Sequence, residues 1–209
     1  MQKQKLVIKG TAIFILSIAS VGGLSEQKAD ANVSGETIVI DAGHGGHDSG
    51  AYANGLYEKE LVYDVAHRTE QRLSEVGAEV IMTREGDSFV ELIDRANIAN
   101  DSGADSFVSI HANAHSDPGV SGTETFHHPS DNDGETLASD LQDNMVEEFG
   151  SNDRGVKSGD FSVLRNTDMP AALAELGFVT NKGEAETMKT DHFRNKAANA
   201  LYQGLHEYH

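Results

Sequence analysis

Histidine and acidic side chains lie at the ends of apolar segments that are typical of buried strands. His44, His111 and Glu175 each stand at or near the carboxyl end of such a segment, and Glu58 opens the helical pattern that follows the glycine-rich turn 43–50. Because ligands of open α/β folds bind beyond the carboxyl ends of the strands, we expect the three strand-end residues to meet at one edge of a sheet. Two imidazoles and one carboxylate, with a position left for water, form a catalytic zinc set, and a second carboxylate could act as a general base.

Each of these residues also has an ordinary explanation. A single histidine such as His44 at a strand end is usually a polar surface residue, although a second one in a similar small-residue turn strengthens the metal hypothesis. Glu58 could be a first-turn acid that the helix dipole favours. Glu175 is harder to explain in this way, because its neighbours in the sequence are almost all apolar. A carboxylate among apolar residues destabilises the fold unless it has a partner, so its presence there indicates a function.

The remaining histidines give weaker signals. His47 shares the glycine-rich turn and could line the site. His115, His127 and His128 follow predicted strands at loop-like positions, where we expect them to be mostly solvated. The turn has neither the G-x-x-x-x-G-K-[ST] nor the G-x-G-x-x-G order, so phosphate binding is the weaker hypothesis.

The first 31 residues have the features of a secretory signal peptide. Lys3, Lys5 and Lys9 precede an apolar run at 12–24, and Ala29-Asp30-Ala31 has the pattern of a cleavage site. The run is shorter than the roughly 20 apolar residues that span a bilayer. We therefore predict cleavage after residue 31 and secretion, the alternative being a retained membrane tether.

Composition excludes several classes of partner. The net charge of −18 becomes −20 once residues 1–31, with four lysines and two acidic residues, are removed. Such acidity argues against nucleic acid and against stable association with an anionic membrane, and it is also what adaptation to a salty medium would produce. The chain has no cysteine, so a metal site must use histidine and carboxylate ligands.

Strand and helix patterns alternate after a short polar leader at 32–36, which predicts a single α/β domain over 37–209 with a mostly parallel or mixed sheet. The strand candidates are Thr37–Ile40, Glu79–Thr83, Ser106–Ile110, Gly122–Phe126, Phe161–Leu164 and Ala171–Ala174. The helix candidates are Glu58–Val76, Val90–Asn100, Gly134–Phe149 and Asp191–Tyr208.

With these residues assembled, the chain resembles the zinc-dependent N-acetylmuramoyl-L-alanine amidases of the amidase-3 family, which hydrolyse peptidoglycan. The segments that carry the resemblance occur in family order and span about residues 37–208. They are Ile40-Asp41-Ala42-Gly43-His44-Gly45-Gly46, Glu58-Lys59, Thr83-Arg84, Arg95-Ala96-Asn97, Ser109-Ile110-His111-Ala112-Asn113-Ala114, Gly122-Thr123-Glu124-Thr125, and Met169-Pro170 through Glu175-Leu176-Gly177-Phe178-Val179-Thr180-Asn181.

The resemblance implies that His44, Glu58 and His111 hold one zinc ion per chain and that Glu175 activates the water. It also implies an α/β fold with a mixed six-stranded sheet flanked by helices. The reaction would be cleavage of the amide between N-acetylmuramic acid and the L-alanine of the stem peptide.

Asn113 and Arg154 are candidates for hydrogen bonds to the substrate. The expected partner is peptidoglycan, and we expect the protein to act as a monomer in the cell wall or the extracellular medium. Two other hypotheses stay open: a zinc peptidase that cuts within the stem peptide, and a wall-binding module without catalytic activity.

Overall fold

The computed structural model describes residues 33–209, so the predicted signal peptide at 1–31 lies outside the described residues. In chain order the elements are β1 (Thr37–Ala42), β2 (Tyr52–Ala53), β3 (Leu56–Tyr57), α1 (Glu58–Glu75), β4 (Glu79–Met82), α2 (Leu92–Ser102), β5 (Ser106–Asn113), β6 (Thr123–His127), α3 (Asn132–Phe149), β7 (Asp153–Ser158), α4 (Ser162–Arg165), β8 (Ala171–Phe178), α5 (Lys182–Met188) and α6 (Asp191–Tyr208). Among residues 33–209, no helix is both long and apolar enough to cross a membrane.

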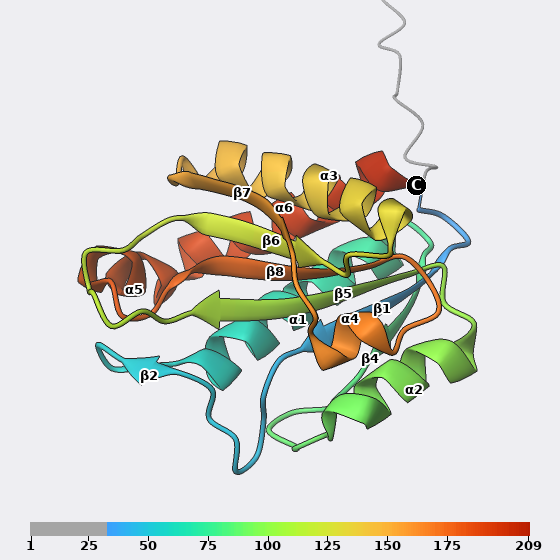
Figure 1. Ribbon diagram of the computed structural model, residues 1–209, viewed down its shortest axis with the longest axis horizontal. Coiled ribbons are helices and arrows are strands. Elements are labelled where there is room, and N and C mark those ends of the chain that lie inside the picture. The colour runs from blue at the N-terminus through green and yellow to red at the C-terminus, as the bar shows by residue number, and fades with distance from the viewer. Residues whose placement is uncertain (1–32) are drawn as a thin grey trace, which may run out of the picture.

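A six-stranded sheet forms the centre of the molecule, with the strand order β4-β1-β5-β8-β6-β7 (Figure 1). The first four of these strands run parallel to one another, β6 is antiparallel to β8, and β7 is parallel to β6. The predicted α/β class and the mixed, mostly parallel sheet are therefore confirmed. A separate hairpin of β2 and β3 leads directly into α1.

Helices cover the two faces of the sheet unequally. The long helices α1, α3 and α6 pack on one face, whereas α2 and the short α4 lie on the other (Figure 1). Side chains alternate along each strand, so Ile38 and Ile40 join the larger hydrophobic cluster and Val39 joins Phe107 and Leu173 in the smaller one. The central strands are thus buried on both sides, which explains their nearly continuous apolar sequences.

The same alternation puts the candidate site on the face that α2 and α4 cover. His111 follows Phe107 by four residues and Glu175 follows Leu173 by two, so all four side chains share that face. The register of β5 and β8 places His111 directly opposite Glu175. The two functional side chains therefore lie next to each other at the carboxyl ends of neighbouring parallel strands.

The strand predicted at Phe161–Leu164 is wrong. Ser162–Arg165 form the single helical turn α4, in which the amides of Leu164 and Arg165 donate to the carbonyl of Phe161 at 3.1 and 2.9 Å. The consecutive residues Val163 and Leu164 are both buried, which one turn of helix allows and a strand with one covered face does not.

Four elements had no predicted counterpart: the two-residue strands β2 and β3, the strand β7 and the helix α5. The sixth strand is β7, an edge strand whose sequence Asp-Arg-Gly-Val-Lys-Ser contains one apolar side chain. Edge strands are commonly charged, which limits pairing with other chains and also hides the alternating pattern. The helix α5 has seven residues, too few for a helical period, and it begins where the Asn181 side chain accepts hydrogen bonds from the amides of Gly183 and Glu184.

Candidate metal centre

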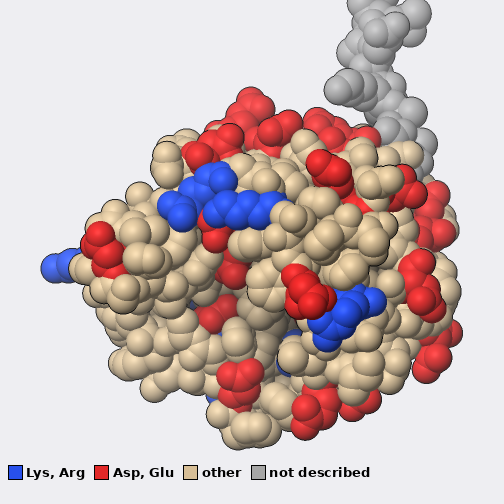
Figure 2. Space-filling model, in the orientation of Figure 1, with Lys and Arg blue, Asp and Glu red and all other residues tan. Residues whose placement is uncertain are grey.

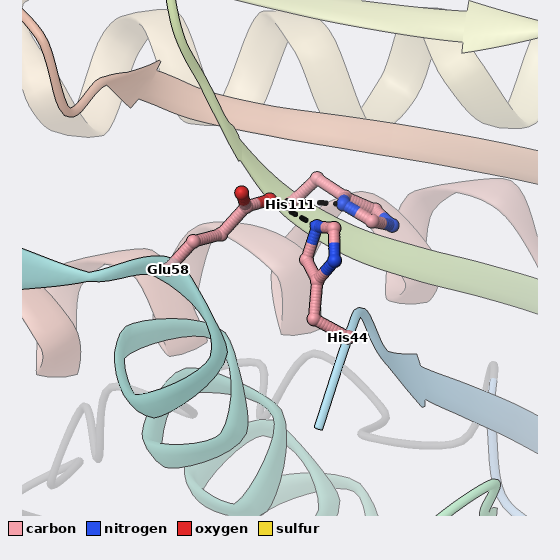
Figure 3. Close-up of side chains that lie close together, drawn as sticks. All are labelled: His44, Glu58 and His111. Carbon is pink, nitrogen blue, oxygen red and sulfur yellow. Dashed lines mark hydrogen bonds and ion pairs between the residues drawn. The ribbon is translucent and has the colours of Figure 1, made fainter. Parts of the chain in front are cut away.

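The Glu58 carboxylate faces the imidazole rings of both His44 and His111 (Figure 3). Its Oε1 is 3.0 Å from His44 Nε2 and 3.0 Å from His111 Nδ1. Each of the three residues offers one potential ligand atom, and these three atoms all lie within 4.8 Å of one another. The three residues come from the turn after β1, the first residue of α1 and β5, so the fold brings together side chains that are distant in sequence.

Backbone amides hold the Glu58 carboxylate in place. The amide of Ala112 donates to Oε1 at 3.0 Å, and that of Ala51 donates to Oε2 at 2.8 Å. Burial would raise the pKa of Glu58, but the hydrogen bonds and charges of His111 and His44 outweigh it and hold the pKa far below its ordinary value. Glu58 is therefore an ionised carboxylate with little freedom to turn, as a metal ligand must be.

Asp48 fixes the orientation of the His44 ring. Its Oδ2 is 2.8 Å from His44 Nδ1, which leaves Nε2 facing Glu58. Histidines that ligate metals are usually held in this way by a carboxylate on the other ring nitrogen. Burial would lower the pKa of His44, but the hydrogen bonds and charges of Glu58 and Asp48 raise it to about 9. The sequence placed Asp48 in the turn, but nothing in the spacing alone assigned it this role.

Glycines at two positions permit the close approach of these elements. A Cβ on Gly43 would overlap the imidazole ring of His111, and a Cβ on Gly50 would lie 2.6 Å from both Glu58 Oε2 and His44 Cδ2. Gly50 also has a φ of +61°, and His44 itself has a φ of +61°, a conformation that is uncommon outside glycine. Gly43 and Gly50 are therefore positions where a side chain would prevent this close approach.

Two buried arginines hold the backbone of the turn that carries His44. Arg95 donates to the carbonyls of Ala42 and His44 at 2.8 and 2.7 Å, and to Asp41 Oδ1 at 2.8 Å. Arg84 donates from Nε to the carbonyl of Ala42 at 2.8 Å. Sequence reasoning gave neither arginine an individual role. The signal that could have revealed Arg95 is its position beside Ala96 and four residues before Ala99, on the buried side of a helix.

Glu175 is a largely buried carboxylate beside the His44, Glu58 and His111 group. Its Oε2 is buried and has no hydrogen-bond partner among the described residues. Burial raises the pKa of Glu175 to about 7, since the nearby His111 offsets only part of the desolvation. A carboxyl group with a pKa near neutrality can both accept and return a proton at physiological pH.

A cavity of about 390 Å³ opens on this group. His44, His111 and Glu175 belong to its lining, which also has an apolar part. The apolar lining comes from the loop before α2, from the beginning of α2, from α4 and from β8: Phe89, Val90, Leu92, Phe161, Val163 and Leu173. The cavity thus combines a few polar groups with an apolar wall, as sites for organic substrates commonly do.

The two residues predicted to contact substrate converge on Glu124 in β6. Asn113 Nδ2 donates to Glu124 Oε1 at 2.8 Å, and Arg154 Nε donates to Oε2 at 2.7 Å. Glu124 is opposite Glu175 in the sheet, so this group adjoins the candidate centre. Sequence reasoning gave Glu124 no role, although an acidic residue between two threonines of a strand was a visible signal.

The remaining histidines lie away from the centre. His47 is exposed, and its ring centroid is 4.1 Å from that of Phe89, so it contacts the loop that borders the cavity. His115 is exposed and His128 half-buried. The expectation for His127 is wrong: it is the last residue of β6 and is 8% exposed, because its strand pairs with Ala172 of β8.

Comparison with known proteins agrees with this fold and places the chain in a family. The family model described as N-acetylmuramoyl-L-alanine amidase matches residues 38–207. The uncharacterised protein YqiI of Bacillus subtilis is 43% identical over 180 residues, which cover 85% of this chain and 86% of YqiI. The N-acetylmuramoyl-L-alanine amidase LytC of B. subtilis is 40% identical over 179 residues, which cover 85% of this chain and 36% of LytC.

A solved structure shows the same architecture. The catalytic domain of CwlV, an N-acetylmuramoyl-L-alanine amidase from Bacillus (Paenibacillus) polymyxa var. colistinus, superposes with a TM-score of 0.79 at 37% identity, covering 83% of this chain and 97% of that domain. An α/β sheet with a His, Glu and His group at its edge therefore defines this chain as a cell-wall hydrolase with a candidate metal site. It belongs to the N-acetylmuramoyl-L-alanine amidase family, whose substrate is peptidoglycan.

Proposed function

We propose that this chain hydrolyses the amide between N-acetylmuramic acid and the L-alanine of the stem peptide, using one zinc ion that His44, Glu58 and His111 hold. The observation that carries this proposal is the buried Glu175 carboxyl group, which has an unpartnered oxygen beside three potential metal ligands. Two imidazoles and one carboxylate are a ligand set typical of catalytic zinc. Zinc bound there lowers the pKa of a coordinated water to about 7 and polarises the amide carbonyl.

Glu175 acts as the general base and then as the general acid. Its carboxylate takes a proton from the attacking water, and its carboxyl group returns that proton to the leaving nitrogen of L-alanine. The raised pKa of about 7 makes both transfers accessible at neutral pH. Asn113 and Arg154 contribute hydrogen bonds that position the substrate beside Glu175.

Digestion of purified peptidoglycan, followed by mass spectrometry of the products, tests this function. We expect free stem peptides that begin with L-alanine, and glycan strands that keep intact lactyl groups. A peptidase that cuts within the stem would leave L-alanine on muramic acid, and a glycosidase would yield reducing-end muropeptides. Either product pattern would contradict the proposal, as would binding to the wall without any release.

Metal binding should strengthen as the pH rises from 6.5 toward His44's pKa of about 9 in the metal-free protein. The metal must displace the proton of His44, and one displaced proton gives about a tenfold gain in apparent affinity per pH unit below that pKa. Competition with a chelator of known affinity measures the slope. His44→Ala, which removes both the ligand and its proton, is the control and should bind more weakly with a shallower slope. An affinity independent of pH in the unaltered protein would contradict the ligand assignment.

We further propose that the first 31 residues direct export and that the protein acts as a monomer outside the cell. Relatives named as cell wall amidases, one in Bacillus anthracis and one in Staphylococcus epidermidis, support a location in the wall or the medium. Sequencing the amino terminus of the exported protein tests cleavage after Ala31, and retention of residue 1 would indicate a membrane tether instead.

A further inference from the structure

Two cationic side chains from the edge strand β7 share one buried carboxylate. Arg154 Nε donates to Glu124 Oε2 at 2.7 Å, and Lys157 Nζ donates to the same oxygen. Burial would raise the pKa of Glu124, but Lys157 and Arg154 hold it below the ordinary value. Glu124 is therefore ionised, and the group of three carries one positive charge in excess.

The excess charge faces solvent. The side chains of Arg154 and Lys157 are 30% and 38% exposed, whereas that of Glu124 is 7% exposed. Figure 2 shows Lys and Arg side chains gathered over β7, beside a hollow that contains acidic groups. The net charge of the chain is −18, so a group with an excess positive charge stands out against the overall charge. An anion that enters the hollow would meet both cations before it meets Glu124.

Both cations have hydrogen-bond donors that do not contact Glu124. Arg154 donates from Nε to Glu124 and from Nη1 to the carbonyl of Ser121 at 3.4 Å, and its Nη2 has no hydrogen-bond partner among the described residues. Its guanidinium carbon lies 5.0 Å from the centroid of the Phe178 ring, which fixes the plane of the group. Lys157 uses one donor on Glu124 and can offer others. A carboxylate fits such a pair, because it accepts several hydrogen bonds at once.

The distance from Glu175 matches the length of a short peptide. Glu124 lies opposite Glu175 in the antiparallel pair of β6 and β8, about one strand spacing, roughly 5 Å, away, and the cation heads contact the Glu124 carboxylate. An extended peptide advances about 3.3–3.6 Å per residue. The second residue after the scissile amide therefore reaches these cations when the amide nitrogen is at Glu175.

We propose that Arg154 and Lys157 bind the α-carboxylate of the second stem residue, D-glutamate linked through its γ-carboxyl group. This inference rests on the proposed amidase function. It assigns the stem peptide to the β7 side of Glu175 and leaves the apolar part of the cavity, with Leu92 and Phe161, for the muramoyl side. The chain should accordingly prefer stems with a free α-carboxylate over stems in which that group is an amide.

Two muramoyl tripeptides that differ only at this group test the proposal: one carries L-Ala-γ-D-Glu-L-Lys and the other L-Ala-γ-D-isoglutaminyl-L-Lys. We expect kcat/KM to be about tenfold higher for the tripeptide with the free α-carboxylate (the acid) than for the amide. A difference of this size corresponds to the loss of one charge-assisted hydrogen bond. Lys157→Gln should lower kcat/KM for the acid by about that factor and leave the amide unchanged, and Lys157→Arg should restore the preference. The matched control is Lys196→Gln, since Lys196 is 36% exposed, also pairs with a glutamate and lies on α6.

Equal kcat/KM for acid and amide in the unaltered protein would overturn the proposal, and so would an equal loss for both substrates in Lys157→Gln. Should no variant hydrolyse either tripeptide, the amidase function itself would be wrong. An NMR titration with the free tripeptides L-Ala-γ-D-Glu-L-Lys and L-Ala-γ-D-isoglutaminyl-L-Lys then tests, independently of catalysis, whether the protein binds the α-carboxylate. Tighter binding of the acid, lost in Lys157→Gln, supports the site, and equal binding refutes it.

Discussion

Replacing Glu175 with glutamine should lower amidase activity by about 10²–10⁴-fold, the usual contribution of a general acid–base group. Glutamine keeps the size of the side chain and cannot carry the proton. Because His44, Glu58 and His111 stay in place, the metal content of Glu175→Gln should equal that of the unaltered protein. Release of stem peptides from purified peptidoglycan measures activity, and elemental analysis measures the metal.

The free energy of unfolding of Glu175→Gln distinguishes the loss of a catalytic group from a folding defect. Burial raises the folded-state pKa of Glu175 from 4.5 to about 7, so the ionised side chain destabilises the metal-free fold increasingly as the pH rises through that interval. Glutamine removes this effect. At pH 8 the metal-free Glu175→Gln protein should be more stable to urea by on the order of 2–3 kcal/mol, while at pH 4 the two should be similar.

Glu60→Gln, an exposed change in the first turn of the same helix as Glu58, is the control for altered charge and should keep full activity. Full activity in Glu175→Gln would contradict the assignment of the base. Loss of metal from Glu175→Gln would instead make Glu175 a ligand.

The outline of the candidate site could be predicted because its side chains follow apolar strands. Parallel strands place their carboxyl ends together, so His111 and Glu175 were expected at the same edge of the sheet. That their strands are direct neighbours is seen only in the structure. Glu58 could be placed by its position at the start of a long helix, and its role as a ligand came from the family resemblance. Local patterns were sufficient here because each residue lies at the end of a strongly periodic element.

Residues that act through tertiary contacts could not be predicted in the same way. Glu124, Arg154 and Lys157 meet because β7 pairs with β6, and the polar sequence of β7 does not indicate a strand. The pairing of Asp41 with Arg95 joins residues 54 positions apart, and no spacing rule predicts it. The segment 161–164 was misassigned because a short apolar run fits both a strand and one helical turn.

Removing the Arg95 guanidinium should destabilise the protein by about 3–5 kcal/mol, the usual loss when one partner of a buried ion pair is deleted. Arg95 and Asp41 are each 1% exposed, and in Arg95→Met the Asp41 charge would keep only the hydroxyls of Thr83 and Ser109. Urea unfolding of the metal-free protein measures this change in the free energy of unfolding.

The same variant should also bind metal more weakly, because Arg95 donates to the carbonyl of His44, whose φ of +61° needs support. Chelator competition at one pH measures this effect separately from stability. In the double variant with Asp41→Asn, the buried charge is gone, so much of the lost stability should return, while the His44 turn stays unsupported and metal affinity stays low. If metal affinity recovers together with stability, Arg95 supports the fold alone and has no separate role in positioning His44.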